Sequence, residues 1–246
     1  MKKNVIIFGG TSEIATEIAK LHIKNKDNIF LAGRDVSRLA KIQSQLSKEK
    51  NQSIIKCKFF EARSRKTIND VFREAIKTYG TVNTVIIAHS VMYNFKNKFK
   101  LEKDEIKIID VNVIGTIRII NCSLKHLNSR SKVIFLSSVA SLRGRSSNYV
   151  YGASKAFVNV YLQGLQNKLF KKNINFLTVN LGPVNTRFSK EVKLRFLKAN
   201  KKEVALAIFK QIISGTKQEI FVPYYWKYIM FIIQIIPNFI FNRLKF

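Results

Sequence analysis

The chain has 246 residues and a formal net charge of +29, because 44 Lys and Arg residues stand against only 15 Asp and Glu residues. This length suits one α/β domain with a large hydrophobic core, and a chain with only three prolines and ten glycines has no region with the composition of a disordered segment. The lysines are spread along the whole chain without a nucleic-acid-binding motif, so we expect no nucleic acid as a partner.

The first predicted element is a buried strand over residues 3–8 that leads into a glycine turn and a helix. Its apolar run ends at Gly9, and apolar side chains then recur with helical spacing from Ile14 to Leu21. A helix N-terminus offers N–H groups and a partial positive charge, which suits a pyrophosphate. The alternative is an ordinary turn capped by Ser12. The cofactor contacts predicted here are Gly9, Gly10, Thr11, Ser12 and Ile14.

A second strand is predicted over residues 28–32, and Gly33, Arg34 and Asp35 follow it. In a dinucleotide-binding fold, an acidic residue at this strand end binds the ribose 2′-hydroxyl of NAD, whereas an arginine accommodates the 2′-phosphate of NADP. Asp35 stands one residue late for the NAD role and suits the N-cap of a helix over residues 36–48. We therefore expect Arg34 to contact the cofactor, and NADP(H) to be favoured over NAD(H).

Five further apolar strands follow, each separated from the next by a helical segment. They are expected over residues 53–60, 82–88, 132–136, 174–181 and 219–222. Strands that alternate with helices imply right-handed crossovers and a parallel sheet. The prediction is a single Rossmann-type, doubly wound α/β domain over residues 1–222, with about seven strands and helices on both faces. A C-terminal apolar segment over residues 223–246 follows it.

Tyr151 and Lys155 are the residues that point most directly to chemistry. Their spacing of four places them on one face of a helix, and Ser138, thirteen residues before Tyr151, ends a strand that would run beside this helix. We expect the lysine charge to lower the pKa of the tyrosine, so that the phenol exchanges a proton near neutral pH. These three groups suit interconversion of a carbonyl and an alcohol; the alternative is an exposed helical pair.

The chain also carries an asparagine, Asn112, in a predicted helix before the Ser138 strand. With Ser138, Tyr151 and Lys155 in this order, residues 3–222 resemble the short-chain dehydrogenase/reductase family. The resemblance implies that the four residues form the catalytic set of an NAD(P)-dependent oxidoreductase. In that set Tyr151 donates the proton, Ser138 binds the carbonyl oxygen, and Asn112 holds a water that relays protons to Lys155.

Two cofactor motifs depart from the family pattern. Glu13 and Ala15 stand at the second and third glycine positions, and Ile-Ala-His-Ser at residues 87–90 replaces an Asn-Asn-Ala-Gly turn. An acid at position 13 would repel a pyrophosphate unless it is turned away. The resemblance implies further cofactor contacts from Glu61, Ala88, Tyr151, Lys155, Gly182, Val184 and Thr186, of which the backbone at Val184 and the Thr186 hydroxyl would fix the carboxamide.

Within the family, residues 9–14, residues 137–152 and the apolar, basic C-terminus are similar to those of decaprenylphosphoryl-2-keto-ribose reductases. Those enzymes reduce a keto sugar on a polyprenyl phosphate carrier, which implies a role in cell-envelope polysaccharide biosynthesis. The candidate substrate contacts are Arg143, Arg145 and Phe188, and an amphipathic basic helix is expected over residues 188–198. For the arginines the alternative is a solvated loop, and for the helix that begins at Phe188 it is an ordinary solvated lid. For the function the alternatives are reduction of another lipid ketone, acyl or sphingoid, and a non-catalytic NADP-binding regulator.

Residues 224–236 are apolar nearly all round, and Pro237, Arg243 and Lys245 follow them. The run is too short for a spanning helix, which needs about 20 residues, and suits a segment at a membrane surface. The alternative is a core helix or a dimer contact. The positive charge of the chain would attract an anionic membrane surface, although a lysine-rich composition also arises from an AT-rich coding sequence.

The remaining features concern compartment and partners. Cys57 and Cys122 are not paired by spacing and are expected as buried free thiols in a reducing compartment. The first strand begins so early that we expect no signal peptide, and the three histidines form no cluster that suggests a metal. The prediction is a cytoplasmic protein, peripheral at the inner face of the membrane. Family resemblance implies a homodimer or homotetramer through the helices of Asn112 and Tyr151.

Overall fold

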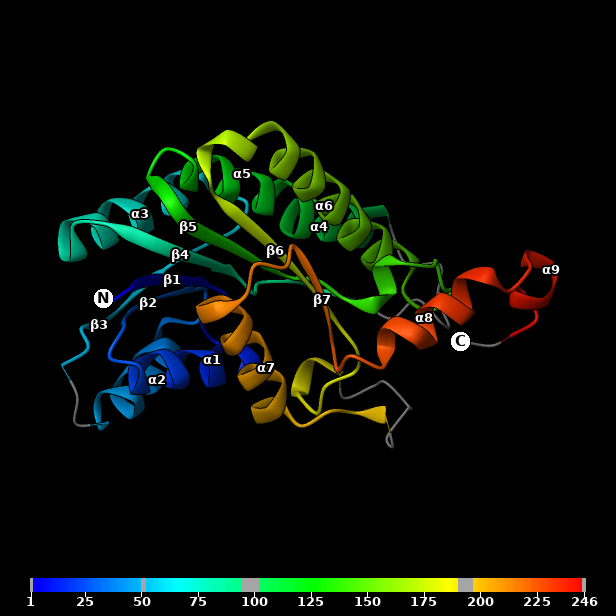
Figure 1. The fold of residues 1–246 in the computed structure, drawn as a ribbon, viewed down its shortest axis with the longest axis horizontal. Helices are drawn as coiled ribbons and strands as arrows, with labels where there is room; N and C mark the ends of the chain where they lie inside the picture. The colour runs from blue at the N-terminus through cyan, green and yellow to red at the C-terminus, as the bar shows by residue number, and fades with distance from the viewer. Residues whose placement is uncertain (1, 50–51, 94–101, 190–196, 245–246) are drawn as a thin grey trace.

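A computed structural model of the chain describes residues 2–49, 52–93, 102–189 and 197–244 (Figure 1). Within these residues lies a seven-stranded, fully parallel sheet with the strand order β3-β2-β1-β4-β5-β6-β7. The order runs outward from β1 on one side and from β4 on the other, so the predicted doubly wound sheet is confirmed. The strands are β1 (Asn4–Phe8), β2 (Asn28–Gly33), β3 (Ile55–Phe59), β4 (Val82–Ile87), β5 (Leu127–Leu136), β6 (Asn175–Leu181) and β7 (Glu219–Val222).

Helices cover both faces of the sheet (Figure 1). One face carries α1 (Glu13–Lys24), α2 (Val36–Ser47) and α7 (Lys201–Ser214), and the other carries α3 (Arg65–Tyr79), α4 (Glu102–Ile109), α5 (Gly115–Ser123) and α6 (Tyr149–Lys168). Alternate side chains of β1 enter different cores: Val5 and Ile7 pack on the first face, Ile6 and Phe8 on the second. A strand buried on both faces explains why this segment is a continuous apolar run.

β5 differs most from the predicted strand, because it begins at Leu127 and not at residue 132. Residues 128–130 are exposed, and Arg130 has a φ of 69°. The register between β4 and β5 shifts between Val82 and Thr84. These polar residues lack the apolar pattern from which strands are predicted, so the sequence located only the buried second half. The other predicted strands, and the helix after Asp35, agree with the structure to within two residues.

Cys122 is a buried free thiol as expected, whereas Cys57 is only half-buried. Cys57 lies in β3, which is an edge strand of the sheet and therefore lacks a neighbour on one side. The helix expected over residues 188–198 falls mostly on residues 190–196, which lie outside the described ranges. Arg187–Ser189, just before them, form a single 3₁₀ turn.

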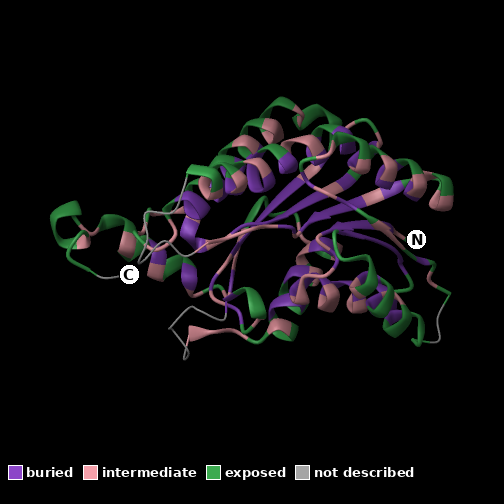
Figure 2. Ribbon diagram, turned by 180° about the vertical axis from the view of Figure 1, so that it is seen from behind, coloured by how far each residue is buried: buried purple, intermediate pink, exposed green. Residues whose placement is uncertain are grey.

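After β7 the chain forms α8 (Trp226–Ile235) and α9 (Asn238–Phe241), which project from the body of the molecule (Figure 1). Much of this projection is exposed (Figure 2). Across the described ranges, none of the helices has both the length and the apolar character needed to cross a membrane.

Candidate active site

A cavity of about 910 Å³ lies at the carboxyl ends of the central strands. The strand order reverses between β1 and β4, and the diverging connections leave a crevice at such a point. Of the predicted site residues, Gly10, Asn112 and Arg143 do not belong to the described lining. The predicted residues that line the cavity are Gly9, Thr11, Ser12, Ile14, Arg34, Glu61, Ala88, Ser138, Arg145, Tyr151, Lys155, Gly182, Val184, Thr186 and Phe188.

The turn after β1 packs tightly against its neighbours. Gly9 has a φ of 86°, and a Cβ at this position would lie 2.5 Å from the backbone nitrogen of His89. A side chain here would be both strained and in collision. The amides of Gly9 and Gly10 donate to the carbonyl of Ala32 at 2.8 and 2.9 Å, which holds the turn against β2. Position 9, the first glycine of the turn, therefore requires glycine in this chain.

Ser12 precedes α1, but its side chain makes no capping hydrogen bond. The first turn of α1 keeps its N–H groups and its positive dipole end beside the cavity, where Thr11, Ser12 and Ile14 are lining residues. This arrangement suits an anion better than the alternative of an ordinary turn capped by Ser12.

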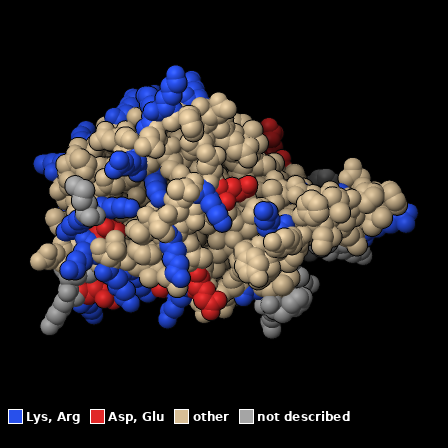
Figure 3. Space-filling view, in the orientation of Figure 1, with Lys and Arg blue, Asp and Glu red and all other residues tan. Residues whose placement is uncertain are grey.

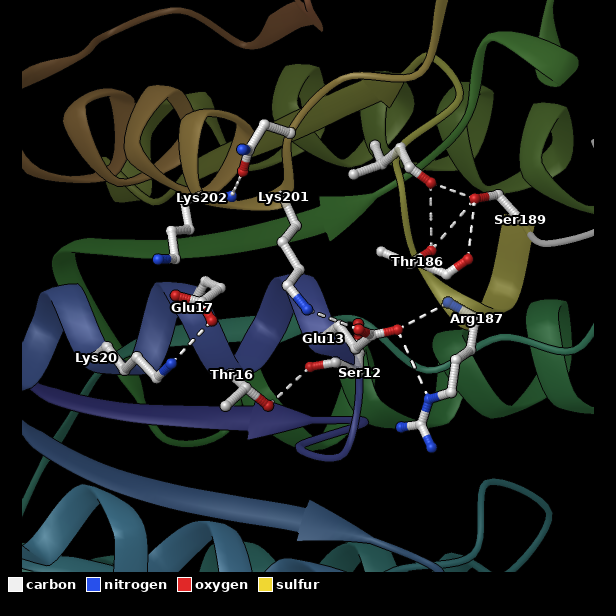
Figure 4. Close-up of polar contacts among 12 residues, drawn as sticks. Ser12, Glu13, Thr16, Glu17, Lys20, Thr186, Arg187, Ser189, Lys201 and Lys202 are labelled. Carbon is white, nitrogen blue, oxygen red and sulfur yellow. Dashed lines mark hydrogen bonds and ion pairs between the residues drawn. The ribbon is translucent and has the colours of Figure 1, made fainter. Parts of the chain in front are cut away.

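Glu13, which stands at a glycine position of the family motif, is turned to Arg187 and Lys201, which come from later segments of the chain (Figure 4). Its Oε1 accepts a hydrogen bond from Nζ of Lys201 at 2.8 Å, and its Oε2 accepts one from the backbone N–H of Arg187 at 2.7 Å. Burial alone would raise the pKa of Glu13, but the hydrogen bonds and positive charges of Lys201 and Arg187 outweigh it and lower that pKa. The negative charge at this position is therefore paired.

At the end of β2, Asp35 is the N-cap of α2, as predicted. Its Oδ1 accepts hydrogen bonds from the backbone N–H of Arg38 at 2.9 Å and from the Ser37 hydroxyl at 2.8 Å. Arg34 and Arg38 both line the cavity here. The prediction omitted Arg38, which lies in the first turn of α2, three residues after the N-cap Asp35.

Tyr151 and Lys155 lie one turn apart in α6 and are 6% and 2% exposed. The Tyr151 hydroxyl is hydrogen-bonded to Ser138, after β5, and to Ser90, after β4. Gly152 permits this position, because a Cβ there would lie 2.6 Å from the carbonyl oxygen of Ala140. Glycine at position 152 thus lets α6 approach the turn that follows Ser138.

The predicted effect of Lys155 on Tyr151 is wrong for the protein alone. Nζ of Lys155 donates to the carbonyl of Leu136 at 3.0 Å and lies 5.7 Å from the centroid of the Tyr151 ring. Burial raises the pKa of Tyr151 to about 12, against the hydrogen bonds of Ser138 and Ser90, which lower it. Burial also lowers the pKa of Lys155 to about 7. Removal from water disfavours each charge more strongly than these polar neighbours favour it.

Asn112 lies in a π-helical turn, Asp110–Ile114, between α4 and α5, and is 1% exposed. Its Oδ1 accepts hydrogen bonds from the Ser90 hydroxyl at 3.1 Å and from the N–H of Val91 at 2.8 Å. Its Nδ2 donates to the carbonyl of Val91 at 2.9 Å and to the Ser154 hydroxyl at 3.1 Å. Asn112 therefore joins the turn after β4 to α6, and Ser90 connects it to the Tyr151 hydroxyl.

Ser90 was not predicted as a site residue. It stands at the glycine position of the family's Asn-Asn-Ala-Gly turn, so a hydroxyl in place of a hydrogen atom was the available signal. His89, beside it, donates from Nε2 to the carbonyl of Val111 at 3.0 Å. Burial, with the charges of Lys155 and Arg34, lowers the pKa of His89 to about 4, which keeps this ring neutral. Within the described ranges, no group of three His, Cys, Asp or Glu side chains is placed to hold a metal ion.

The two predicted substrate arginines have different surroundings. Arg145 lines the cavity, and its Nη2 is buried with no hydrogen-bond partner among the described residues. Burial lowers the pKa of Arg145. Arg143 instead donates from Nη1 to the carbonyl of Gln234 at 3.0 Å and from Nη2 to Oδ1 of Asn238 at 3.0 Å. Its guanidinium is therefore committed to the C-terminal segment and not to the cavity.

Phe188 is one of the residues that line the cavity. Its ring centroid is 6.0 Å from that of Tyr151, and the side chain is 48% exposed. It gives the cavity an apolar wall near the Tyr151 ring.

Comparisons with known proteins agree with this architecture. An uncharacterized oxidoreductase of Mycobacterium tuberculosis is 22% identical over 242 residues, which cover 98% of this chain and 96% of that protein. An uncharacterized oxidoreductase of Staphylococcus epidermidis is 27% identical over 188 residues, 75% of this chain and 79% of that protein.

Solved structures share the fold. A short chain dehydrogenase from Burkholderia cenocepacia, in complex with NADP, has a TM-score of 0.79 and 15% identity, over 87% of this chain and 91% of that one. An alcohol dehydrogenase from Thermococcus sibiricus, complexed with 5-hydroxy-NADP, has a TM-score of 0.79 and 18% identity, over 90% and 96% of the two chains. The sequence model of the short chain dehydrogenase family matches residues 3–195. The chain therefore belongs to the short-chain dehydrogenase/reductase family of oxidoreductases.

Proposed function

We propose that this oxidoreductase reduces a ketone to an alcohol with NADPH as the reductant and Tyr151 as the proton donor. The observation that carries the proposal is the Tyr151 hydroxyl, which is hydrogen-bonded to Ser138 and Ser90 and lies one helical turn from Lys155. These side chains face one cavity at the carboxyl ends of the strands. A buried phenol with two hydroxyl neighbours is placed to give a proton and not merely to fill the core.

The cavity fits a nicotinamide dinucleotide. Gly9, Thr11, Ser12 and Ile14 would hold the pyrophosphate at the start of α1, where the turn has no room for a side chain at position 9. Arg34 and Arg38 would bind the 2′-phosphate, which supports a preference for NADP(H). The structures from Burkholderia cenocepacia and Thermococcus sibiricus, which contain NADP and an NADP analogue, support the same cofactor class. The remaining proposed cofactor contacts are Glu61, Ala88, Tyr151, Lys155, Gly182, Val184 and Thr186.

The proposed chemistry divides between cofactor and protein. NADPH, when bound, supplies the hydride that reduces the carbonyl carbon. The Ser138 hydroxyl donates a hydrogen bond to the carbonyl oxygen and stabilises the charge that develops there. Tyr151 gives its proton to that oxygen, which completes the alcohol. The reaction would then reprotonate Tyr151 through its polar neighbours, Ser90 and Asn112 on one side and Lys155 on the other.

The pKa values suit reduction more than oxidation. A pKa of about 12 keeps Tyr151 protonated near neutral pH, the form that a proton donor needs. A pKa of about 7 allows Lys155 to hold or release its proton in the same range. The ammonium form of Lys155 would favour the phenolate that remains after proton transfer, because an opposite charge nearby stabilises an anion.

For the substrate we propose a keto sugar carried on a polyprenyl phosphate, as in cell-envelope polysaccharide biosynthesis. Arg145 supports an anionic group, because its buried Nη2 has no hydrogen-bond partner in the described part of the chain. A buried donor without a partner is costly, and a phosphate oxygen would satisfy it. Phe188 supports an apolar neighbour such as a lipid chain. A lipid-linked substrate would place the protein at the inner face of the cytoplasmic membrane.

We also propose a homodimer or homotetramer formed through the helices around Asn112 and Tyr151. α4 and α6 pack side by side. They expose Ile106 and Ile109 on α4, and Phe157 and Val160 on α6, between 37% and 66%. Exposed apolar side chains that gather on two adjacent helices support a contact between subunits.

The test is NADPH oxidation by purified, detergent-solubilised protein supplied with a polyprenylphosphoryl 2-keto-pentose. Tyr151→Phe is expected to abolish nearly all turnover and to preserve NADPH binding, measured by cofactor fluorescence. Tyr149→Phe is the matched control, because Tyr149 lies on the same helix but is 46% exposed. Turnover in the Tyr151 variant would disprove the proton-donor role. Turnover of soluble acyl or sphingoid ketones alone would reassign the substrate and leave the reductase chemistry intact.

A further inference from the structure

The helix α8 has apolar side chains on two faces with different surroundings. Trp226 and Met230 are 2% and 0% exposed and pack with Val139, the residue after Ser138. The other face carries Tyr228, Phe231, Ile232 and Ile235, which are between 59% and 64% exposed. In a water-soluble protein a helix that is apolar all round normally has a partner on each face. Only the inner face of α8 has one within the described chain.

The exposed apolar surface continues into α9, where Phe239 is 68% exposed and Ile240 is 43% exposed. We call residues 226–241 the C-terminal arm. The arm projects from the body, and its visible surface is mostly neither acidic nor basic (Figures 1 and 3). The inner face of α8 packs beside Val139, next to Ser138, so the opposite face of α8 is left uncovered by the described residues.

Charge distinguishes among possible partners of the arm. The sequence has no Asp or Glu after Glu219, whereas Lys227, Arg243 and Lys245 flank the apolar residues. The chain as a whole carries a formal charge of +29. An anionic lipid surface complements both features. A second arm does not, because it would bring like charges together.

The size of the arm determines how it could meet a bilayer. α8 has 10 residues, which corresponds to a length of about 15 Å. The hydrocarbon core of a bilayer is about 30 Å thick. The arm would therefore lie in the interface, with its outer face toward the acyl chains and its basic residues toward the headgroups.

Arg143 connects the arm to the active-site loop between Ser138 and Tyr151. Its Nη1 donates to the carbonyls of Ile233 and Gln234, at 2.5 and 3.0 Å, near the C-terminus of α8. Its Nη2 donates to Asn238, and its guanidinium carbon lies 4.0 Å from the ring centroid of Phe241. One side chain, from the loop that also carries Arg145, thus contacts both α8 and α9.

We propose that the C-terminal arm docks on an anionic lipid bilayer, and that Arg143 couples this docking to the loop that carries Arg145. Only one part of this proposal, the role of the cavity beside this loop as a substrate site, rests on the proposed function. A bilayer-bound arm would hold Arg143, and through the same short loop would hold Arg145, at the cavity. The substrate site would then be most ordered at the surface that holds a lipid-linked substrate.

Docking is tested by flotation with vesicles of equal parts phosphatidylcholine and phosphatidylglycerol, beside vesicles of phosphatidylcholine alone. The intact protein is expected to float with the anionic vesicles, and Phe231→Ser/Ile235→Ser is expected to lose most of that binding. Phe170→Ser is the matched control, because Phe170 is 74% exposed after the far end of α6. Equal binding by the double variant would overturn the proposal, as would failure of the intact protein to bind.

Light scattering after size-exclusion chromatography tests the second possible partner of the arm, which is another copy of the chain. An oligomer that breaks in the double variant, without any vesicle binding by the intact protein, would assign the arm to a contact between copies. Far-UV circular dichroism shows whether the variants fold. None of these measurements depends on turnover, so docking and the proposed reaction can fail separately.

Coupling is tested by hydrogen–deuterium exchange of the amides in residues 139–148. Anionic vesicles are expected to protect these amides in the intact protein and to leave them unprotected in Arg143→Gln. Arg73→Gln serves as the control, because Arg73 is an exposed arginine on α3, far from the arm. Vesicle binding without a change in loop exchange, or equal protection in both arginine variants, would overturn the coupling.

Discussion

Oε1 of Glu13, in the first turn of α1, accepts a hydrogen bond at 2.8 Å from Nζ of Lys201, the first residue of α7 and 188 positions later in the chain. The other carboxylate oxygen binds the backbone N–H of Arg187. The acid that replaces a glycine of the cofactor motif thus ties the turn after β1 to the segment that follows Thr186 (Figure 4). An acid that would repel a pyrophosphate is paired with a lysine that lies far away in the sequence.

This pairing predicts the effect of Lys201→Met on cofactor affinity. Without the ammonium, the Glu13 carboxylate is left beside the proposed pyrophosphate site, and repulsion between the two raises the KM for NADPH. The pair is partly exposed, so its contribution is about 1 kcal/mol at most, which corresponds to a rise of roughly fivefold. Initial rates at varied NADPH concentration measure the change.

Lys202→Met is the control for this substitution, because the neighbouring lysine has no ion pair with Glu13 in the described structure. Glu13→Gln added to Lys201→Met is expected to restore the KM, since the amide removes the charge that causes the repulsion. If the double variant is no better than Lys201→Met, the pair acts through the structure of the loop and not through charge.

The strands and the four catalytic candidates could be predicted because each leaves a local signal. β1 and β2 contain continuous apolar runs, and β4 ends in one. The spacing of Tyr151 and Lys155 places them on one helical face without knowledge of the fold. The partners of Glu13 could not be predicted, because Lys201 meets it only after the sheet is assembled. The pKa values of Tyr151 and Lys155 were inaccessible for the same reason: spacing reports proximity, whereas burial is a property of the whole core.

Arg143 and Arg145 show the same limit on a smaller scale. Both stand in the loop between Ser138 and Tyr151, and the sequence offered no reason to separate them. The structure assigns one to the C-terminal segment and leaves the other at the cavity, because helix α8 packs beside the loop. The position of α8 depends on Trp226, which packs closely on Gly182. A Cβ added at Gly182 would lie 2.1 Å from Nε1 of Trp226.

Ser90→Ala is expected to slow turnover without weakening NADPH binding. The Ser90 hydroxyl bonds Tyr151 and lowers the pKa of that phenol, so its loss raises the pKa of Tyr151 further. One such hydrogen bond contributes about 1 kcal/mol, and kcat is expected to fall roughly fivefold to tenfold. In the direction of alcohol oxidation, which needs the phenolate, the rise of kcat with pH is expected to move to higher pH.

Two comparisons separate this role from a structural one. Ser90→Thr keeps a hydroxyl and is expected to recover the pH profile. Ser137→Ala is the control, because the Ser137 hydroxyl is buried with no partner in the described ranges. A pH profile that stays fixed in Ser90→Ala while kcat falls would contradict the contact with Tyr151.

Arg34→Ala and Arg38→Ala test the preference for NADP(H). Both arginines line the cavity at the end of β2, and a hydrogen bond to a charged group contributes about 1.5–3 kcal/mol. Since Arg34 is exposed, we expect the lower end of that range, a rise of roughly tenfold in the KM for NADPH. The KM for NADH, which has no 2′-phosphate, is expected to change little. Equal effects on both cofactors would remove the basis for the preference.

Lys155 predicts how stability depends on pH. Burial lowers the pKa of Lys155 from 10.5 to about 7 in the folded protein, so between these values the unfolded chain binds more protons at this site. The free energy of unfolding therefore rises with pH across this window, by up to about 1.4 kcal/mol per pH unit, and the contribution is lost as the pH falls through about 7. Lys155→Met lacks the titrating group and is expected to lose this slope.

Urea unfolding of the two cofactor-free proteins at several pH values between about 7 and 9 measures the difference between their free energies of unfolding, in which the contributions of other titrating groups cancel. Parallel slopes for the two proteins would mean that the ammonium of Lys155 keeps its hydration in the folded state.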